Sequence, residues 1–555
     1  MDRIKRLALE NALKYGKADV DKVLGKVLAE SPELKNDINK LKQKIKVIVH
    51  EVNALSNENK ENLLRRLNPK FFEKKESIEK EIKELKNVHK EMVLRFEPSP
   101  SGPLHLGHAY VLCLNYAYAK KYNARLILRI ADTNASNIYP QAYDLIPRDA
   151  KWLTNDFIKD DDIIVQSDRL DLYYEYALKF LEKGIVYICT CPAESFRELV
   201  AKKEECSCRK NSIDTNIKKW HKMFSGYNEG DVVMRMKSDI SHKNPALRDF
   251  PLFRINDDEH PRHGKKYRVW PLMNFAVSVD DHDTCVTHII RAKDHADNAI
   301  RQKMIFEAFG WDIPETEFVG KINFKGMNLS TTETRTKIDD GMYEGWDDIR
   351  LAFLPALRRR GYKPDAFLNY ALSIGITLND KTTSKEELFK QLDSFNKQLI
   401  EKTSYRYFFI PEPYKIHITN APEINVELDL HPDERKGGRK FNCAGDFYVC
   451  EELSDGLYRL MDCLNFVYEN GKAKFHSLKY ADVKDKKATI INWLPSTEHL
   501  VDVEVKMPDN AIIKGKGEHL LQDLEEGAIV QFVRFGFCRY DRNEGDKMVF
   551  WFLHK

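Results

Sequence analysis

The sequence predicts a multidomain protein built around an α/β domain, with a helical segment before it and one or two β-barrels after it. The chain has 555 residues, too many for a single hydrophobic core. From residue 92 onward, short apolar strands alternate with helical periods, which is typical of βαβ units. From residue 404 onward, short alternating strands recur with turn residues between them, which indicates barrels.

The amino-terminal 88 residues are rich in Lys, Glu, Leu and Asn, and apolar residues recur at helical spacing over 19–29 and 40–52. A charged run over 73–92 follows, which we interpret as a solvated helix face or, alternatively, as a contact for a partner. The pattern predicts a small helical appendage without assigning it a function.

The α/β segment begins with a strand after Met92, continues through a Pro/Gly/Ser turn into a helix after His105, and returns as a strand over 124–130. Further strands are expected around Val279 and over 286–290. Residues 185–268 hold four clustered cysteines and several short strand-like pieces, so they read as an insertion into the α/β domain.

Composition excludes several classes of protein. The net charge of +3 does not mark a nucleic-acid binder by bulk, so any RNA surface must come from local clusters of Lys and Arg. No run of about 18 apolar residues exists to span a membrane. The amino terminus lacks the apolar core of a secretory signal. We therefore expect a soluble, cytoplasmic protein.

The strongest local signal is VLRFEPSPSGPLHLGHAY, where a strand ends in a tight turn and a helix begins. Such a turn presents backbone N–H groups and a helix amino terminus to an anion. His105 and His108 can point from one side of the helix start, and Gly107 lets a nucleotide approach the backbone. Read alone, the two histidines could also be ordinary surface residues.

His105-Leu106-Gly107-His108 resembles the HIGH signature of class I aminoacyl-tRNA synthetases, and RFEPSPSGPLHLGHA is similar to the version in the glutamyl and glutaminyl branch. The resemblance implies a Rossmann-type catalytic domain that uses ATP and Mg²⁺. It gives the two histidines, with Gly107 and Ser330, the task of stabilising charge on the triphosphate. The archaeal glutamyl type fits the whole chain from about residue 90, and implies a glutamate–tRNA ligase.

A second signature of the family, the KMSKS-like loop, is matched by GMNLSTTETRTK over 326–337. The resemblance makes this an ATP-binding loop, although alone it reads as a polar turn. Glu333 stands where archaeal relatives usually have a lysine, so phosphate contact could fall to another residue. The candidate loop residues are Lys325, Leu329, Ser330, Thr331, Thr332, Arg335 and Lys337.

The block WPLMNFAVSVDDHDTCVTHIIRAKDH resembles the segment that shapes the amino-acid pocket. Arg291 takes the place of an arginine found in glutamyl and not in glutaminyl enzymes, and its planar fork suits a carboxylate better than an amide. Arg95 corresponds to a second arginine facing the substrate. The predicted substrate-binding residues are Arg95, Ser99, Asp132, Met273 and Arg291.

Three pocket positions depart from the family. Ala131 replaces the acid that would receive the substrate ammonium group, so Asp132 could substitute for it. Met273 replaces a pocket tyrosine, and Val277 replaces an asparagine of bacterial glutamyl enzymes. Because these changes remove polar contacts, either the pocket is rebuilt or its specificity has drifted.

The cysteine group is Cys189-Thr190-Cys191, a fourteen-residue spacer, and Cys206-Ser207-Cys208. Two pairs of thiols supply four soft ligands, which predicts a structural zinc site; the alternative is four reduced cysteines in a loop. The resemblance places this group in the insertion that approaches the acceptor end of tRNA.

RYFFIPEP, HPDERKGGRKF and IVQFVRFGFCRYD resemble the β-barrel anticodon-binding region of archaeal glutamyl enzymes. Exposed basic and aromatic side chains on barrel strands suit unstacked bases. The candidate tRNA-binding residues are Arg435, Lys436, Arg439 and Lys440, although a solvated basic loop would look the same.

The predicted partners are L-glutamate and tRNA(Glu). Charging of tRNA(Gln) as well is left open and would require a tRNA-dependent amidotransferase downstream; the oligomeric state stays open. The rival interpretations are a glutaminyl enzyme, a small nucleotidyltransferase, which the length excludes, and a tRNA-binding paralogue with altered catalysis. The predicted divisions are 1–88, helical; 89–184, catalytic domain, first half; 185–268, acceptor-end insertion with a four-cysteine zinc site; 269–340, catalytic domain, second half; 341–403, helical stem-contact domain; and 404–555, β-barrel anticodon-binding region.

Overall fold

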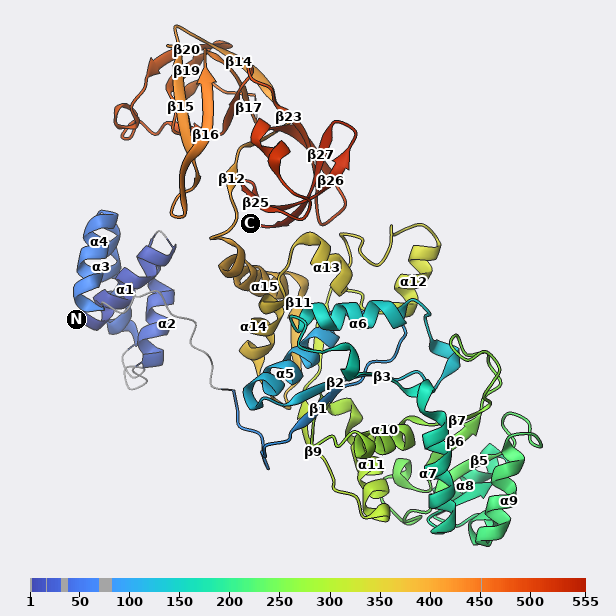
Figure 1. Cartoon of the computed structure of the whole chain (residues 1–555). Helices are drawn as coiled ribbons and strands as arrows, with labels where there is room; N and C mark the ends of the chain where they lie inside the picture. The colour runs from blue at the N-terminus through green and yellow to red at the C-terminus, as the bar shows by residue number, and fades with distance from the viewer. Residues whose placement is uncertain (1, 16, 31–37, 69–81, 451) are drawn as a thin grey trace. The chain divides into compact units, whose positions relative to one another are not determined.

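The computed structural model describes the chain except residues 1, 16, 31–37, 69–81 and 451 (Figure 1). The chain divides into two compact units, residues 1–81 and 82–555. Among the described helices, none combines the length and the apolar character that crossing a membrane requires.

The described part of the first unit consists of packed amphipathic helices. They are α1 (Asp2–Tyr15), α2 (Val20–Glu30), α3 (Ile38–Ala54) and α4 (Asn57–Leu67). Helix α3 buries Leu41, Ile45, Ile48, Val49 and Val52, a spacing of three and four residues that forms one apolar stripe. The same stripe packs against α1 and α2 in a single small core.

The charged run expected to form a helix face does not do so where it is described. Residues 73–81 lie outside the described residues, and residues 82–92 contain no helix. The first unit also ends before the expected boundary at residue 88, because Leu85 is buried in the core of the second unit.

The second unit is organised around a parallel five-stranded sheet of order β3-β2-β1-β8-β9. The strands are β1 (Val93–Phe96), β2 (Arg125–Ile130), β3 (Ile163–Val165), β8 (His288–Ala292) and β9 (Glu315–Val319). The chain winds outward from β1 in one direction to β3 and in the other direction to β9. This reversal makes a topological switch point between β1 and β8, where ligands of doubly wound sheets bind beyond the carboxyl ends of the strands.

Helices cover both faces of this sheet. They are α5 (Leu106–Tyr122), α6 (Ala142–Leu153), α7 (Leu170–Glu182), α10 (Met273–Asp283) and α11 (Ala296–Phe309). Leu94 and Phe96 join the core around α5, whereas Arg95 points to the opposite face and contacts Asp281 of α10. The strand expected around Val279 is wrong, because that apolar run is helix α10; a helix buried all round shows no period that separates it from a strand.

Residues 185–271 form a separate antiparallel sheet of order β4-β5-β6-β7. Its strands are β4 (Val186–Cys189), β5 (Val233–Met236), β6 (Pro251–Ile255) and β7 (Val269–Pro271), with helices α8 (Ala193–Lys202) and α9 (Ile213–Met223). The expectation of short strands within this segment is confirmed. Their core continues into α7 and α10, so the segment is fixed to the parallel sheet domain.

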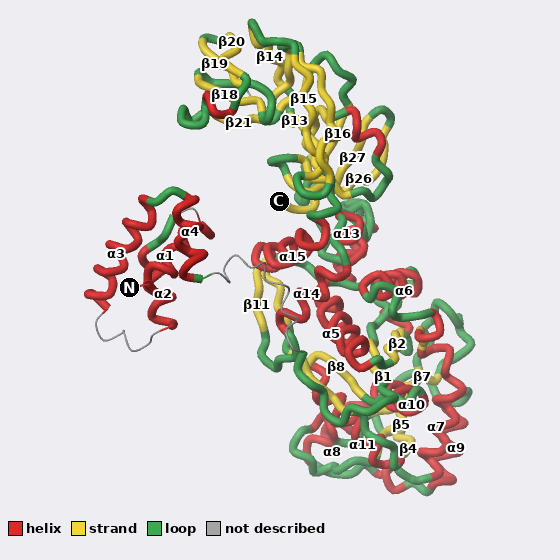
Figure 2. Tube along the Cα trace, turned by 60° about the vertical axis from the view of Figure 1, so that its left-hand side comes forward, coloured by secondary structure: helices red, strands yellow, loops and turns green. Residues whose placement is uncertain are grey.

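A helical segment connects this domain to the strand-rich carboxyl-terminal part (Figure 2). It contains α13 (Leu354–Arg360), α14 (Pro364–Ile374) and α15 (Lys385–Ile400), while β10 (Ile322–Lys325) pairs with β11 (Lys381–Ser384). Helix α14 packs against α5, and α13 packs against β26 (Gly536–Glu544) and β27 (Lys547–His554). The segment therefore touches both the parallel sheet domain and the carboxyl-terminal strands.

The carboxyl-terminal part has two seven-stranded sheets with separate cores, plus a two-stranded hairpin. In one sheet the edge strands are β12 (Arg406–Tyr407) and β13 (Phe409–Pro411), which are neighbours in sequence, so that sheet is nearly closed into a barrel. The remaining strands are β14 (Tyr414–Thr419), β15 (Ile424–His431), β16 (Arg435–Cys443), β17 (Asp446–Val449), β18 (Gly456–Leu460), β19 (Asn465–Glu469), β20 (Lys472–Ser477), β21 (Thr489–Ile491), β22 (Trp493–Pro495), β23 (Val501–Lys506), β24 (Ile512–Gly517), β25 (Ile529–Phe532), β26 (Gly536–Glu544) and β27 (Lys547–His554).

Candidate active site

The two histidines of the HxGH turn cap helix α5. His105 is the N-cap, and its Nδ1 accepts hydrogen bonds from the backbone N–H groups of Gly107 at 3.0 Å and His108 at 3.4 Å. The Nδ1 atom of His108 in turn accepts from the backbone N–H of His105 at 3.4 Å. This reciprocal arrangement is a capping box built from two imidazoles, and it explains the spacing of three residues between them.

The cap also fixes the tautomer of both rings. Because each Nδ1 accepts a hydrogen bond, the ring proton must sit on Nε2, which is left as a donor. Burial lowers the pKa of His105 to about 4 and that of His108 well below its usual value, so both are neutral at pH 7. The rings stack with centroids 3.8 Å apart, and together they offer N–H donors at a helix amino terminus.

Gly107 is required by this stacking. A Cβ added there would lie 3.0 Å from Cε1 of His105, closer than side chains normally approach. A larger residue would therefore displace the ring that caps the helix.

The predicted ATP-binding loop is shorter than expected, because a helix begins inside it. Helix α12 (Thr331–Asp339) starts after the N-cap Ser330, whose Oγ accepts from the backbone N–H of Glu333 at 3.3 Å. The carboxylate of Glu333 pairs with Lys337 one turn later at 2.7 Å. The sequence S-T-T-E is a helix-start signature, so Glu333 is explained by the helix.

This helix start meets the HxGH turn although the two are far apart in sequence. Thr331 Oγ1 donates to Ser101 Oγ at 3.1 Å, and a Cβ at Gly102 would lie 3.0 Å from Thr331. Lys325 is exposed at the end of β10, and the guanidinium of Arg335 lies 5.8 Å from the ring of Tyr139. Leu329 packs against the main core, and Thr332 is exposed.

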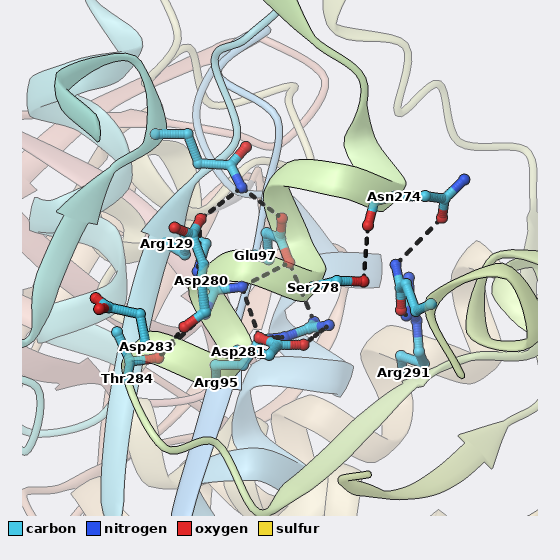
Figure 3. A network of polar contacts seen from close by, with 12 residues as sticks. Arg95, Glu97, Arg129, Asn274, Ser278, Asp280, Asp281, Asp283, Thr284 and Arg291 are labelled. Carbon is cyan, nitrogen blue, oxygen red and sulfur yellow. Dashed lines mark hydrogen bonds and ion pairs between the residues drawn. The ribbon is translucent and has the colours of Figure 1, made fainter. Parts of the chain in front are cut away.

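A buried network of charged side chains lies near the carboxyl ends of the strands of the parallel sheet (Figure 3). Asp281 accepts from Arg129 Nη1 at 2.7 Å and from Arg95 Nε at 3.2 Å. Glu97 Oε2 lies 3.3 Å from Arg95 Nη1 and 3.5 Å from Arg129 Nη1. Asp280 accepts from Tyr173 at 2.8 Å. Arg95 is therefore committed to carboxylates of the protein and is not free to face a substrate alone.

Arg291 differs from these arginines. It projects from β8, 6% exposed, and its Nη1 donates to the amide oxygen of Gln302 at 2.9 Å. Its buried Nε has no hydrogen-bond partner, and no carboxylate of the described residues forms an ion pair with it. Burial, together with the charge of Arg95, lowers its pKa to about 10. A buried cation without a counter-ion is costly, and an anionic ligand would relieve that cost.

Neutral amides position Arg291. Gln302 donates to the side-chain oxygen of Asn274 at 3.3 Å, and Asn274 donates to that of Asn298 at 3.3 Å. Met273 begins α10, is 36% exposed, and accepts from Asn298 through its sulfur at 3.8 Å. Val277 is fully buried. The polar contacts around the guanidinium thus come from an amide chain and not from the tyrosine of the family.

Asp132 does not face outward as a free carboxylate. Its Oδ1 accepts from the backbone N–H of Ser167 at 2.7 Å, and its Oδ2 accepts from Ser167 Oγ and from Tyr143 Oη, each at 2.6 Å. These hydrogen bonds occupy the carboxylate that we expected to receive an ammonium group, because the strand end packs against the loop at Ser167. Ser99 is exposed in the turn after β1.

The cysteines of the insertion lie close together: the sulfurs of Cys189, Cys191 and Cys208 are within 4.8 Å of one another, and Cys206 adjoins Cys189. Cys189 Sγ lies 3.9 Å from Cys206 Sγ, and Cys191 Sγ lies 3.9 Å from Cys208 Sγ. Two thiolates on one tetrahedral zinc ion, each about 2.3 Å from it, are about 3.8 Å apart. The spacing of the sulfurs fits a zinc ion.

The basic residues proposed for tRNA contact lie on strand β16, not in a loop. Arg435, Lys436 and Lys440 are exposed, but Arg439 is only 3% exposed. Its guanidinium pairs with Glu518, with Nε 3.0 Å from Oε2, and lies over the ring of Phe408. Strand alternation turns Arg439 inward, so its side chain is not exposed for a contact with tRNA.

Sequence reasoning missed Glu97, Asp281 and Gln302. Glu97 stands two residues after Arg95, a spacing that puts both on one face of a strand, so its proximity could have been found. The pairing of Asp281 could not, because it depends on how α10 packs on the sheet.

A switch point beside a helix capped by stacked histidines, with a buried unpaired arginine next to it, defines a nucleotide-using catalytic domain of the doubly wound type. The family model described as tRNA synthetases class I (E and Q), catalytic domain, matches residues 91–402, and the corresponding anticodon-binding domain model matches residues 404–484. This chain belongs to the class I tRNA synthetases of the E and Q group.

Among its relatives, the chain is 40% identical to the glutamate–tRNA ligase of Methanothermobacter thermautotrophicus over 100% of this chain and 99% of that protein. It is 42% identical to the glutamate–tRNA ligase of Methanocaldococcus jannaschii and 41% identical to that of Methanococcus maripaludis strain C7, in both cases over the full length of both chains.

Proposed function

We propose that this protein is a glutamate–tRNA ligase. The α-carboxylate of glutamate attacks the α-phosphate of ATP, giving glutamyl-adenylate and pyrophosphate, and the terminal ribose of tRNA then displaces AMP. The observation that carries the choice of glutamate is Arg291, a buried guanidinium at the switch point that forms no ion pair with a carboxylate of the described residues. It suits the γ-carboxylate of glutamate, whereas the amide of glutamine would leave its charge unmatched.

His105 and His108 support the departure of pyrophosphate in this proposal. Their Nε2–H donors are held by the cap and need no rearrangement when negative charge develops on the phosphates. Ser330 and Thr331 adjoin the same turn through Ser101. Lys325 and Arg335 are the better candidates for phosphate contact, because Lys337 is engaged by Glu333. Magnesium would enter on the phosphates of ATP, since the described residues form no carboxylate cluster for it.

We further propose that Cys189, Cys191, Cys206 and Cys208 hold a structural zinc ion, which their sulfur spacing supports. A bound zinc would cross-link β4 to the turn after α8 and rigidify the segment 185–268, proposed to meet the acceptor end of tRNA. Metal analysis of purified protein should find about one zinc per chain. Cys206→Ser should lower both the zinc content and the melting temperature. If the unmodified protein kept its melting temperature after removal of the metal, the site would be refuted.

The helical segment 341–403 is proposed to contact the tRNA stem, and the strands over 404–555 to bind the anticodon. Arg435, Lys436 and Lys440 remain candidates for RNA contact because their side chains are exposed on one hairpin.

Charging of transcribed archaeal tRNA(Glu) and tRNA(Gln) with glutamate or glutamine tests the function. We expect tRNA(Glu) to be charged with glutamate. Charging of tRNA(Gln) with glutamate as well would imply an amidotransferase downstream, and charging with glutamine would overturn the assignment. Tight tRNA binding without charging would favour a paralogue with altered catalysis.

A further inference from the structure

A pocket for glutamate needs a carboxylate for the α-ammonium group as well as Arg291 for the side chain. This inference rests on the proposed function and concerns which residue supplies that carboxylate. Among the described residues, the two carboxylates whose charges act on Arg291 are Glu97 and Asp281. Ala131, where the resemblance implies an acid, offers none.

Asp281 is held closely by two arginines. Its Oδ1 accepts from Arg129 at 2.7 Å and from Arg95 at 3.2 Å, and its Oδ2 accepts from Arg95 at 3.4 Å. Burial would raise the pKa of Asp281, but the two guanidinium groups outweigh it and lower the pKa. Asp132 is likewise occupied by hydroxyl and backbone donors. The shortest of these hydrogen bonds is 2.7 Å for Asp281 and 2.6 Å for Asp132, so both carboxylates are held tightly by the protein.

Glu97 is held more loosely. Its Oε1 accepts only from the amide of Gln166 at 3.3 Å, and its Oε2 lies 3.3 and 3.5 Å from Arg95 and Arg129. Charge-assisted hydrogen bonds are usually about 2.7–2.9 Å long, so these contacts leave the carboxylate under-compensated. Burial accordingly raises the pKa of Glu97, although both arginines oppose the shift. Its side chain is only 5% exposed.

Glu97 also stands beside the missing acid. The parallel register pairs Phe96 with Leu128, so Glu97 lies next to Arg129, and Ala131 follows two residues later on the same face. The backbone N–H of Ala131 donates to Pro98 at 3.0 Å, which keeps the two segments adjacent beyond the strand ends.

We propose that Glu97 receives the α-ammonium group of glutamate, in place of the acid absent at Ala131. The pocket is thereby rebuilt from the neighbouring strand: Arg291 binds one end of the substrate and Glu97 the other. Arg95 and Arg129 hold the carboxylate of Glu97 in position without neutralising it fully.

The test compares glutamate with glutarate, which lacks only the amino group. Competition with tRNA present gives the affinity of each ligand for the unmodified protein and for Glu97→Gln. We expect Glu97→Gln to weaken the affinity for glutamate by roughly 10- to 100-fold, as the loss of a charge-assisted contact implies. We expect the affinity for glutarate to change by less than about twofold, which is the usual scatter for a substitution that does not contact the ligand. Adding Ala131→Glu to Glu97→Gln should restore part of the preference for glutamate.

Equal weakening of both ligands by Glu97→Gln would overturn the proposal, since Glu97 would then only hold the arginines. Unmodified protein that binds neither ligand would instead contradict the proposed function. If Glu97→Gln does not fold, Glu97→Asp keeps the charge but withdraws it by one methylene. It should weaken glutamate selectively, and an equal effect on both ligands would again overturn the proposal.

Discussion

Replacement of Arg291 by glutamine should separate recognition from stability. Its guanidinium is buried with a single hydrogen bond to Gln302, so the unliganded protein bears an uncompensated charge. Removing one partner of a buried, hydrogen-bonded charge pair typically costs about 2–5 kcal/mol. Arg291→Gln should therefore lower kcat/KM for glutamate by roughly 30- to 5,000-fold.

The same change should leave the melting temperature of the unliganded protein unchanged or raise it, because it removes a charge that lacks a counter-ion. Arg129→Gln is the matched control. Arg129 is also buried but pairs with Asp281 at 2.7 Å, so its loss should leave that carboxylate unpaired with Arg129 and lower the melting temperature clearly.

Pyrophosphate exchange kinetics and thermal unfolding of both variants are the assays. If Arg291→Gln destabilised the protein as much as Arg129→Gln did while kcat/KM for glutamate stayed within threefold, Arg291 would be a structural residue and the reasoning would fail.

Three other predictions concern the cap, the carboxyl-terminal strands and pH. His105→Asn should keep the helix cap, whereas His105→Ala should lose about 1 kcal/mol of stability. Both variants should lower the rate of glutamate activation by about 10²-fold or more, and an active asparagine variant would contradict the role of His105 as a donor. Arg439→Gln should lower the melting temperature because it leaves Glu518 buried without its partner. Lys440→Ala should change only the KM for tRNA. The reverse pattern in unfolding and charging assays would reject these two assignments. Burial raises the pKa of Asp149 to about 7, so the folded protein holds a proton that the unfolded chain releases near pH 4. The free energy of unfolding should then fall between pH 4 and 7 by at most about 1.4 kcal/mol per pH unit, and Asp149→Asn should reduce that slope; an identical slope in urea titrations would be evidence against it.

Local patterns predicted the elements that depend on neighbouring residues. The turn after β1, the helix beginning after His105 and the recurring strands after residue 404 follow from periodicity and turn chemistry, and the structure has them. The helix within the ATP-binding loop was equally local, since Ser330 and Glu333 form a helix-start signature that the resemblance to a loop obscured.

Other features depended on packing that the sequence does not display. The run around Val279 is apolar on every side because it is buried between layers, so no period distinguished a helix from a strand. Arg95 and Arg291 look alike in sequence, yet the first is paired with Asp281 and the second is not. That difference arises from the position of α10 on the sheet.

Arg439 shows the limit of composition as a guide. In a cluster of basic residues it looks like an RNA contact, but alternation along β16 places it on the inner face with Phe441 and Cys443. Recognising the strand would have given the correct assignment from the sequence.

ATP–pyrophosphate exchange is the direct test of whether this chain activates glutamate through a pocket built on Arg291. The assay is run on the unmodified protein with glutamate or glutamine, each with and without an archaeal tRNA(Glu). We expect pyrophosphate exchange with glutamate when tRNA is present, and little exchange with glutamine. Exchange with glutamine in preference to glutamate, or none with either from protein that binds tRNA, would contradict it.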